Sequence, residues 1–327
     1  MASKAFRQLL RALLLVSVLY PPAGSRCHAQ AALLMESADG ISAFLQPTGH
    51  EAVYFARICA ESPTRLRRCG PGELGVVIAR YEKIAGYDWL AIPLLPYLYS
   101  VDDPSEVSAR VDAATVHRLR REYHDEHLLN LPDSVPEGGR VQRGWSQLIG
   151  AAYERRIYGF RFATTEEQDN AFIEAMNAGP NRTHFSLLFN NCANFAASVL
   201  NFYLPHDFSR RAASDAGMVT PRRVAWELVQ YAQSNPDIQL EPFEVPQIPG
   251  YRGPSRTNQS VSGSLIERGY IVPIAFIAPY AAAVIVVDFL LWGRDPLPLA
   301  HAQVLAPGNM SVLANSARLT LDSDQGL

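Results

Sequence analysis

The feature that most limits the architecture of this chain is an apolar segment near its C-terminal end. Residues 270–292 read YIVPIAFIAPYAAAVIVVDFLLW, twenty-three residues with a single charge, at Asp288, and aromatic residues at both ends. That length and composition are typical of a helix that spans a bilayer. Pro273 and Pro279 lie near the first turns of such a helix, where proline is tolerated. We therefore expect a transmembrane helix over 270–292, with a buried hairpin of a soluble core as the alternative.

A second apolar run, at the N-terminus, predicts export. Residues 1–29 combine a basic start, an apolar run over 12–19 and a Pro/Gly/Ser stretch that ends at Ala29, which are the three parts of a secretory signal peptide. The signal carries four basic and no acidic residues, so its removal changes the formal net charge from −3 to −7. A chain of this charge is not expected to bind nucleic acid.

The residues between the two apolar segments have the pattern of one α+β domain. Strands are predicted where apolar and β-branched residues gather or alternate, over 43–59, 73–81 and 184–189. Helices are predicted over 105–128, from a capping box of Thr164 and Glu167 to Gly179, over 192–203 and over 221–232. The division of the chain that we expect is a domain over 30–234, a proline-rich linker over 235–269, the transmembrane helix over 270–292 and a tail over 293–327.

The four cysteines leave one thiol without a partner. Cys27 is removed with the signal peptide. Cys59 and Cys69 stand at the two ends of a predicted hairpin, so they are the natural disulfide pair of an exported chain. Cys192 then remains free, and an exported protein seldom keeps a free thiol that does not react. We expect Cys192 to be a nucleophile; the alternative is a small buried apolar residue at helical spacing with Phe195.

The position of Cys192 suits a nucleophile. It follows two asparagines, Asn190 and Asn191, at the first turn of a predicted helix, where the helix dipole and unpaired N–H groups would lower the pKa of the thiol. An imidazole is also needed, because a proton must be taken from the thiol and returned. His50 is the first candidate, since it stands at the head of a strand and the glycine before it leaves room for a substrate. His184, eight residues before the thiol, is the second.

No cofactor or metal is expected. The sequence contains no zinc-type cysteine pairing, phosphate loop or dinucleotide fingerprint. His117, His124 and His127 lie close together among acidic residues, but HDEH lacks the spacing of the HExxH zinc proteases. A solvated, charged helix face is the preferred interpretation of this cluster.

The order of these elements resembles the circularly permuted papain-like thiol fold of lecithin:retinol acyltransferases and related bacterial proteins, with a Gly-His strand first and a strand–NNC–helix unit downstream. More narrowly, GHEA at 49–52, GVVIARY at 75–81, HFSLLFNNCANF at 184–195 and TPR at 220–222 resemble the bacterial domain-of-unknown-function 4105 group. That group includes lipoprotein intramolecular transacylases of the cell envelope. The resemblance covers residues 40–235.

The resemblance implies roles for particular residues. Cys192 would be the nucleophile and His50 the general base, with a third polar residue, Tyr81 or Glu82, on the second strand to orient the histidine. Ala193 stands where many members of the group have threonine, which leaves the substrate open.

Taken together, these patterns predict an enzyme of the bacterial cell envelope. We expect a cysteine hydrolase or acyltransferase anchored in the cytoplasmic membrane, with its catalytic domain outside, that acts on ester or amide bonds. The tether favours lipid-linked acyl groups, so membrane lipids or lipoproteins would be its partners. The alternatives are an amidase or peptidase of cell-wall peptides and a non-catalytic envelope scaffold.

Overall fold

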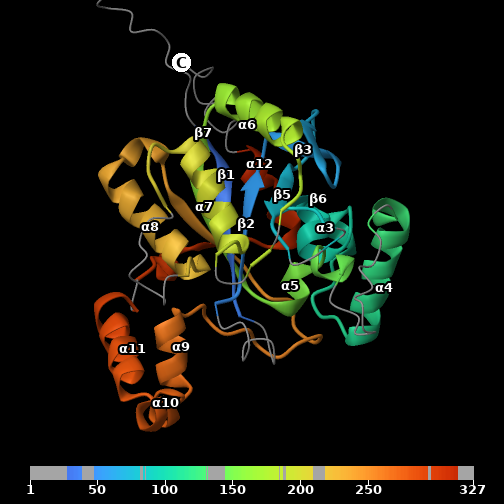
Figure 1. The fold of residues 1–327 in the computed structure, drawn as a ribbon. Coiled ribbons are helices and arrows are strands. Elements are labelled where there is room, and N and C mark those ends of the chain that lie inside the picture. The colour runs from blue at the N-terminus through green and yellow to red at the C-terminus, as the bar shows by residue number, and fades with distance from the viewer. Residues whose placement is uncertain are drawn as a thin grey trace, which may run out of the picture.

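The computed structural model is an α+β structure built on one seven-stranded mixed sheet (Figure 1). It describes residues 28–38, 48–81, 84, 86–129, 131, 144–183, 185–186, 189–208, 218–293 and 296–315. The strands lie in the order β6-β5-β2-β1-β7-β8-β9. Their bounds are β1 His28–Glu36, β2 His50–Phe55, β5 Val76–Ala79, β6 Leu90–Pro93, β7 Ile157–Thr164, β8 Glu241–Val245 and β9 Gln303–Val304. Neighbouring strands are antiparallel except β8 and β9, which are parallel.

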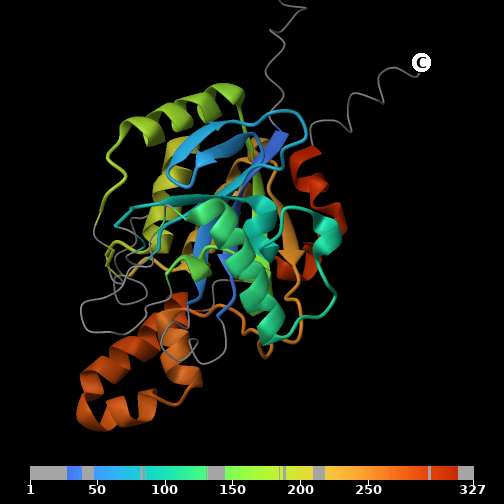
Figure 2. The ribbon, with the colours of Figure 1, turned by 90° about the vertical axis from the view of Figure 1, so that its right-hand side faces the viewer.

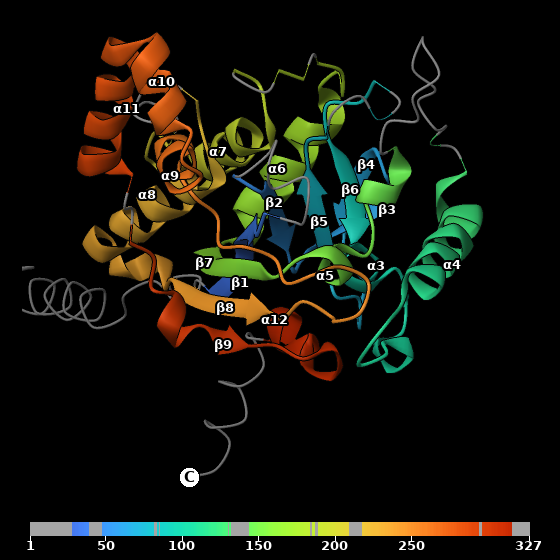
Figure 3. The ribbon, with the colours of Figure 1, turned by 90° about the horizontal axis from the view of Figure 1, so that it is seen from below.

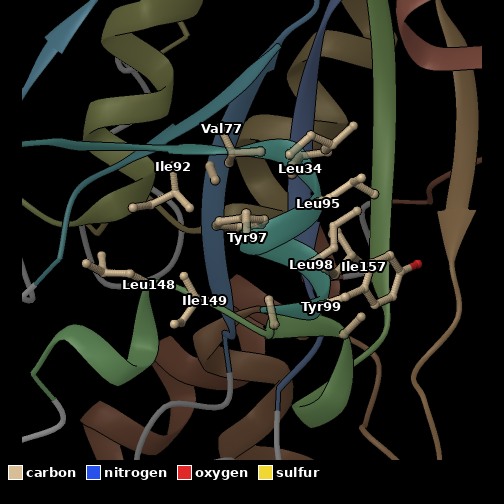
Figure 4. Packing of buried hydrophobic residues seen from close by; sticks show 14 of the residues in the cluster. Leu34, Val77, Ile92, Leu95, Tyr97, Leu98, Tyr99, Leu148, Ile149 and Ile157 are labelled. Carbon is tan, nitrogen blue, oxygen red and sulfur yellow. The ribbon is translucent and has the colours of Figure 1, made fainter. Parts of the chain in front are cut away.

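Helices cover both faces of the sheet (Figures 1 and 2). One face packs against α6 Glu166–Ala178, α7 Cys192–Tyr203 and α8 Pro221–Ser234. The other packs against α3 Leu94–Tyr99, α4 Ala113–Tyr123 and α5 Ala151–Glu154. Because successive residues of a strand point to opposite faces, Val53 joins the first core while Ala52 and Tyr54 join the second. Figure 4 shows the second core, where Tyr97 and Leu98 of α3 lie against Leu34 and Val77 of the sheet.

A small two-stranded hairpin, β3 Ile58–Ser62 and β4 Arg65–Arg68, lies beside the sheet. A disulfide between Cys59 and Cys69 joins its two ends, which confirms the predicted pairing. Closing a loop of this length stabilises the folded chain by about 2–3 kcal/mol. The hairpin is fixed to α6 by the ion pair of Arg57 with Asp169, at 2.7 Å.

The N-terminal strands differ in part from those predicted. The central strand β1 was not predicted, and it begins at His28, inside the segment 1–29 assigned to a signal peptide. The strand predicted over 43–59 corresponds to β2 and β3, while residues 43–47 of it lie outside the described residues. The strand predicted over 73–81 is confirmed in its central part as β5.

Two of the middle helices begin later than predicted, α4 by eight residues and α6 by one. Helix α4 starts after Asp112, whose side chain accepts a hydrogen bond from the N–H of Thr115, and a π-helical turn, His124–Leu128, extends it. The capping box of α6 uses Thr165 and Gln168, one residue after the predicted pair. Residues 185–186 and 189–190, the described part of the strand predicted around 184–189, form only an isolated bridge between Ser186 and Asn190. The predicted linker over 235–269 contains β8, a strand of the sheet.

The predicted transmembrane helix over 270–292 is wrong. The segment forms two helices, α10 Ile271–Ile277 and α11 Pro279–Trp292, preceded by α9 Val261–Glu267. The helix breaks at Ala278 because the following proline lacks an N–H group and disfavours helical geometry in the residue before it. Among the helices of the described chain, none combines the length and the apolar character needed to cross a membrane. The tail that follows supplies β9 and α12 Ser311–Asn315 (Figure 3).

Candidate active site

Cys192 is the first residue of α7, as predicted. The side chain of Asn191 accepts a hydrogen bond from the N–H of Asn194 at 3.0 Å, and the side chain of Asn194 accepts one from the N–H of Asn191 at 3.1 Å. This reciprocal pair fixes the start of the helix. The cap uses the N–H of Asn194, the third helical residue, and does not occupy the N–H groups of Cys192 and Ala193.

The loop before the thiol is fastened to the end of β5. Arg80 donates from its guanidinium to the side-chain oxygen of Asn190 and forms an ion pair with Asp88 at 2.6 Å. The side-chain amide of Asn190 donates in turn to the hydroxyl of Thr183 at 3.1 Å. The Arg80 cation also lies 5.3 Å from the ring centre of Phe195 in α7. Both asparagines named from the sequence therefore position the cysteine rather than stand exposed beside it.

The thiol of Cys192 meets the sheet at the start of β2. The backbone N–H of Glu51 points to the sulfur and lowers the pKa of the thiol, as does the N–H of Ala193. Residue 51 directly follows His50, so the structure brings the predicted nucleophile to the strand end that begins with the predicted base. The two residues are far apart in sequence, and they meet here because α7 packs on β2.

His50 lies on the opposite side of β2 from Glu51, as neighbouring residues of a strand must. Its ring stacks on Tyr81, with ring centres 4.8 Å apart, and its Nε2 atom is buried and has no hydrogen-bond partner within the described chain. Burial lowers the pKa of His50 more than the nearby charge of Glu36 raises it, so the imidazole is neutral at neutral pH. A neutral imidazole with a free nitrogen is the form that a general base requires.

The glycine before His50 has a different role from the one predicted. Gly49 has a φ of +76°, and a Cβ atom built on it would overlap with the carbonyl oxygen of Glu36 and the side-chain amide of Asn258. Asn258 donates to the backbone oxygens of Glu36 and Thr48, both at 2.7 Å. The glycine is thus required by the close approach of three chain segments, and not by space for a substrate.

Glu51 is a functional candidate that the sequence interpretation missed. Its side chain is fully buried, with 0% exposed, and neither carboxyl oxygen has a hydrogen-bond partner in the part of the chain that the structure describes. Burial raises the pKa of Glu51 well above 4.5. A carboxyl group whose ionised form is disfavoured by burial therefore lies beside the thiol. The signal in the sequence is a charged residue at an apolar position of the strand HEAVYF.

Burial also decides the protonation of Cys192. It raises the pKa of the thiol to about 12, and the carboxyl groups of Glu51 and Glu36 add to the rise. The sequence predicted the opposite, a thiol pKa lowered by the start of the helix. A helix terminus contributes about 0.3–2 kcal/mol, or at most about 1.5 pKa units, whereas burial shifts a pKa by up to about 3–5 units. The larger effect wins, so the residue, although partly exposed, carries a protonated thiol at neutral pH.

A polar network continues from His50 away from the thiol. Tyr97 donates a hydrogen bond to Glu36, and Arg155 pairs with the same carboxylate at 3.4 Å. Tyr81, one of the two residues expected to orient the histidine, contacts the imidazole by stacking. The pKa of Tyr81 is raised by burial and by Glu36, and Cys192 adds a smaller rise. The His50 side of β2 therefore carries a network of Tyr81, Glu36 and Arg155.

Two of the predicted site residues, Glu82 and His184, lie outside the described residues. The three histidines considered for a metal each contact something else. His117 packs edge-on against Tyr251, His124 stacks on Trp145, and His127 lies 3.3 Å from Asp102.

The chain matches no protein-family model, and neither the curated proteins nor the solved structures give a match.

Proposed function

We propose that this protein is a cysteine-dependent acyltransferase or hydrolase. One observation carries the proposal: the thiol of Cys192, at the capped start of α7, lies against the backbone of Glu51, directly after His50. A thiol and a neutral imidazole that share one strand end are the components of nucleophilic acyl transfer. The buried Nε2 atom of His50 supports the assignment, since it has no hydrogen-bond partner within the described chain.

In the first step, the sulfur of Cys192 attacks the carbonyl carbon of an ester or amide while the thiol proton moves to His50, whose imidazole must turn toward the sulfur from its place on the other side of β2. The oxygen of the tetrahedral intermediate gains negative charge, and N–H groups at the start of α7 are the donors suited to hold it. The intermediate collapses as the carbon–oxygen or carbon–nitrogen bond breaks. The leaving alcohol or amine takes the proton from His50, which leaves an acyl thioester on Cys192.

In the second step, water or an amine attacks the thioester carbonyl and gives its proton to His50. The carbon–sulfur bond breaks, and the sulfur recovers a proton from the imidazole. Because burial keeps the thiol protonated between turnovers, the transfer from sulfur to imidazole must accompany the attack. A resting thiolate is not part of the cycle.

The proposed substrate and location rest on the sequence alone. The resemblance to the domain-of-unknown-function 4105 group and the apolar segment over 270–292 favour lipid-linked acyl groups of membrane lipids or lipoproteins. The predicted signal peptide favours the cell envelope of a bacterium, with the site outside the cytoplasmic membrane. Cell-wall peptides are the alternative substrate.

One observation favours a different class of function. A thiol with a raised pKa reacts slowly at neutral pH, which suits a non-catalytic envelope module that has kept the fold. The two functions differ in whether Cys192 forms a covalent intermediate.

The test is intact-protein mass spectrometry after incubation with envelope lipids. Cys192 is the one cysteine of the described residues outside the disulfide, so an acyl adduct that hydroxylamine removes should map to it. Cys192→Ala should abolish the adduct, and His50→Asn should slow its formation by about 10²-fold or more. Because the pKa of His50 lies below 6.5, its imidazole stays neutral in mild acid. The rate of adduct formation on Cys192 should therefore persist below pH 6.5.

His117→Asn is the matched control, since it changes an exposed histidine on α4 and should leave the adduct unchanged. If no acyl species appears with lipids or cell-wall peptides, and Cys192 resists alkylation in the folded state, the non-catalytic module is the better account.

A further inference from the structure

Helices α9, α10 and α11 project from the body of the molecule as a separate arm (Figures 1 and 2). The arm begins at Ser260, whose hydroxyl caps α9, and ends at Gly293. Its side chains are distributed in an unusual way, with polar and small residues inside and large apolar residues outside. In water the opposite arrangement is the stable one, because apolar surface is removed from solvent by burial.

The inside of the arm is small and polar. Ser262, Gly263 and Ser264 of α9 are buried, and so are Ala282 and Asp288 of α11. The two helices approach closely enough for Phe289 to lie near the position that a Cβ atom on Gly263 would occupy, at 3.4 Å. Helix pairs within lipid are joined in this manner, through small residues with polar groups turned inward.

The outside of the arm is apolar over a wide arc. Phe276 and Ile277 in α10 are each 86% exposed, and Tyr280 in α11 is 89% exposed. Further exposed residues of α11 are Val284, Val286, Val287, Leu290 and Leu291. At 3.6 residues per turn these cover roughly 160° of the helix, more than the about 100° stripe that packs against a single partner.

We infer that α10 and α11 of this arm insert their exposed apolar side chains into one leaflet of a lipid bilayer. An apolar solvent contacts every exposed side of a helix, whereas a protein partner covers one stripe. The segment from residue 271 to residue 287 contains no ionisable side chain except the phenol of Tyr280, and the charged residues of the arm, Glu267, Arg268 and Asp288, lie outside this segment. The fourteen residues of α11 extend about 21 Å and the seven of α10 about 10 Å, so each helix is shorter than the about 30 Å hydrocarbon core of a bilayer.

The chain enters and leaves the arm on the same side. The hydroxyl of Ser260, before α9, lies 3.3 Å from the carbonyl oxygen of Gly293, after α11. Beyond the arm the chain returns to the sheet, where the N–H of Leu305 donates to the carbonyl of Glu244 at 2.8 Å. An arm with both ends on the body dips into a membrane and returns, and the body remains on one side.

The arm is also joined to the site end of the sheet. Asn258, two residues before the cap of α9, donates to the backbone of Glu36 and of Thr48 at the strand ends that carry the His50 region. Immersion of the arm would therefore hold this end of the sheet close to the lipid surface. Binding itself needs no chemistry at Cys192, so the inference stands apart from the proposed acyl transfer.

Flotation of the full mature chain with phosphatidylcholine vesicles tests the inference. The protein should float with uncharged vesicles and remain bound at high salt, because the contact is apolar. Phe276→Asp and Ile277→Asp should each weaken binding by about tenfold or more, since each places a charge in hydrocarbon. Leu129→Asp is the matched control, because Leu129 is 67% exposed at the end of the helix that extends α4 and should not affect flotation.

Three results would overturn the inference. They are failure of the wild-type chain to float, flotation that disappears at high salt, and unchanged binding of both arm variants. If light scattering instead showed a stable dimer that Ile277→Asp dissociates, with no flotation, a second copy of the chain would be the occupant. Cys192→Ala should float like the wild type, so loss of catalysis and loss of binding are measured separately.

Discussion

Glu51 is the residue whose presence is hardest to explain by stability alone. Its carboxyl is buried and unpartnered within the described chain, an arrangement that costs about 1–3 kcal/mol relative to an apolar side chain of similar shape. Buried polar groups without partners are rare and call for a functional reason. The carboxyl lies beside the sulfur of Cys192, so the site is where that reason is to be sought.

Replacement of Glu51 by methionine should stabilise the protein in a pH-dependent manner. Below about pH 4 the carboxyl is protonated in both the folded and the unfolded chain. As pH rises, the unfolded chain ionises first, because the folded pKa is raised above 4.5, and the wild type loses stability until the folded pKa is reached. Urea unfolding should show Glu51→Met more stable by about 1–3 kcal/mol at pH 4 and by a larger margin at pH 8.

Glu106→Met is the control for this comparison, since Glu106 is exposed in a short 3-10 turn. It should leave the pH dependence of unfolding unchanged. A Glu51→Met variant with the same stability advantage at pH 4 and pH 8 would show that the carboxyl is ionised in the folded protein.

At the scale of elements, the close approach at Gly49 joins β1, β2 and the segment before α9. Gly49→Ala should destabilise the fold by more than the about 1–2 kcal/mol that the left-handed conformation costs any other residue, because the new Cβ would also overlap with Glu36 and Asn258. Gly253→Ala is the control, since a Cβ there meets nothing within 4 Å. Urea midpoints of the two variants measure the difference, and equal midpoints would contradict the required approach.

What the sequence predicts well is local. The start of α7 at Cys192 and the disulfide of Cys59 with Cys69 depend on nearby residues, an asparagine cap and a short hairpin, and both were predicted. Strand β1 was missed because HAQAALLME has no β-branched residue. Its position at the centre of the sheet makes it a strand, and tertiary context overrides propensity there.

What the sequence could not predict depends on distant contacts. The burial that raises the pKa of Cys192 comes from packing of α7 on β2, and the Glu36 carboxylate receives Tyr97 and Arg155 from separate elements. The apolar composition of 270–292 indicated a single helix, but the backbone restriction before Pro279 divides it. The composition thus predicted contact with lipid, which we also infer, but it did not predict the break in the helix.

At the scale of the whole molecule, the arm is an insertion between two parts of one core. Leu305, Met310 and Leu313, which follow the arm, are each 1% exposed and belong to the core on the α3–α5 side of the sheet. The last residues of the described chain therefore complete the domain, although the sequence suggested a detached tail beyond a membrane helix.

This arrangement makes truncation and excision different experiments. A chain that stops at Pro296 loses three buried apolar side chains, each worth about 1.5–3 kcal/mol, together with β9, and should unfold at much lower urea or fail to fold.

A chain in which residues 261–292 are replaced by a short Gly/Ser linker keeps that core. The linker need span little distance, because Ser260 and Gly293 are in contact, so this variant should unfold near the wild-type urea midpoint and no longer float with vesicles. If truncation at Pro296 left the midpoint unchanged, or if excision of the arm unfolded the domain, the arm would not be the separable insertion that the return of the chain to β8 indicates.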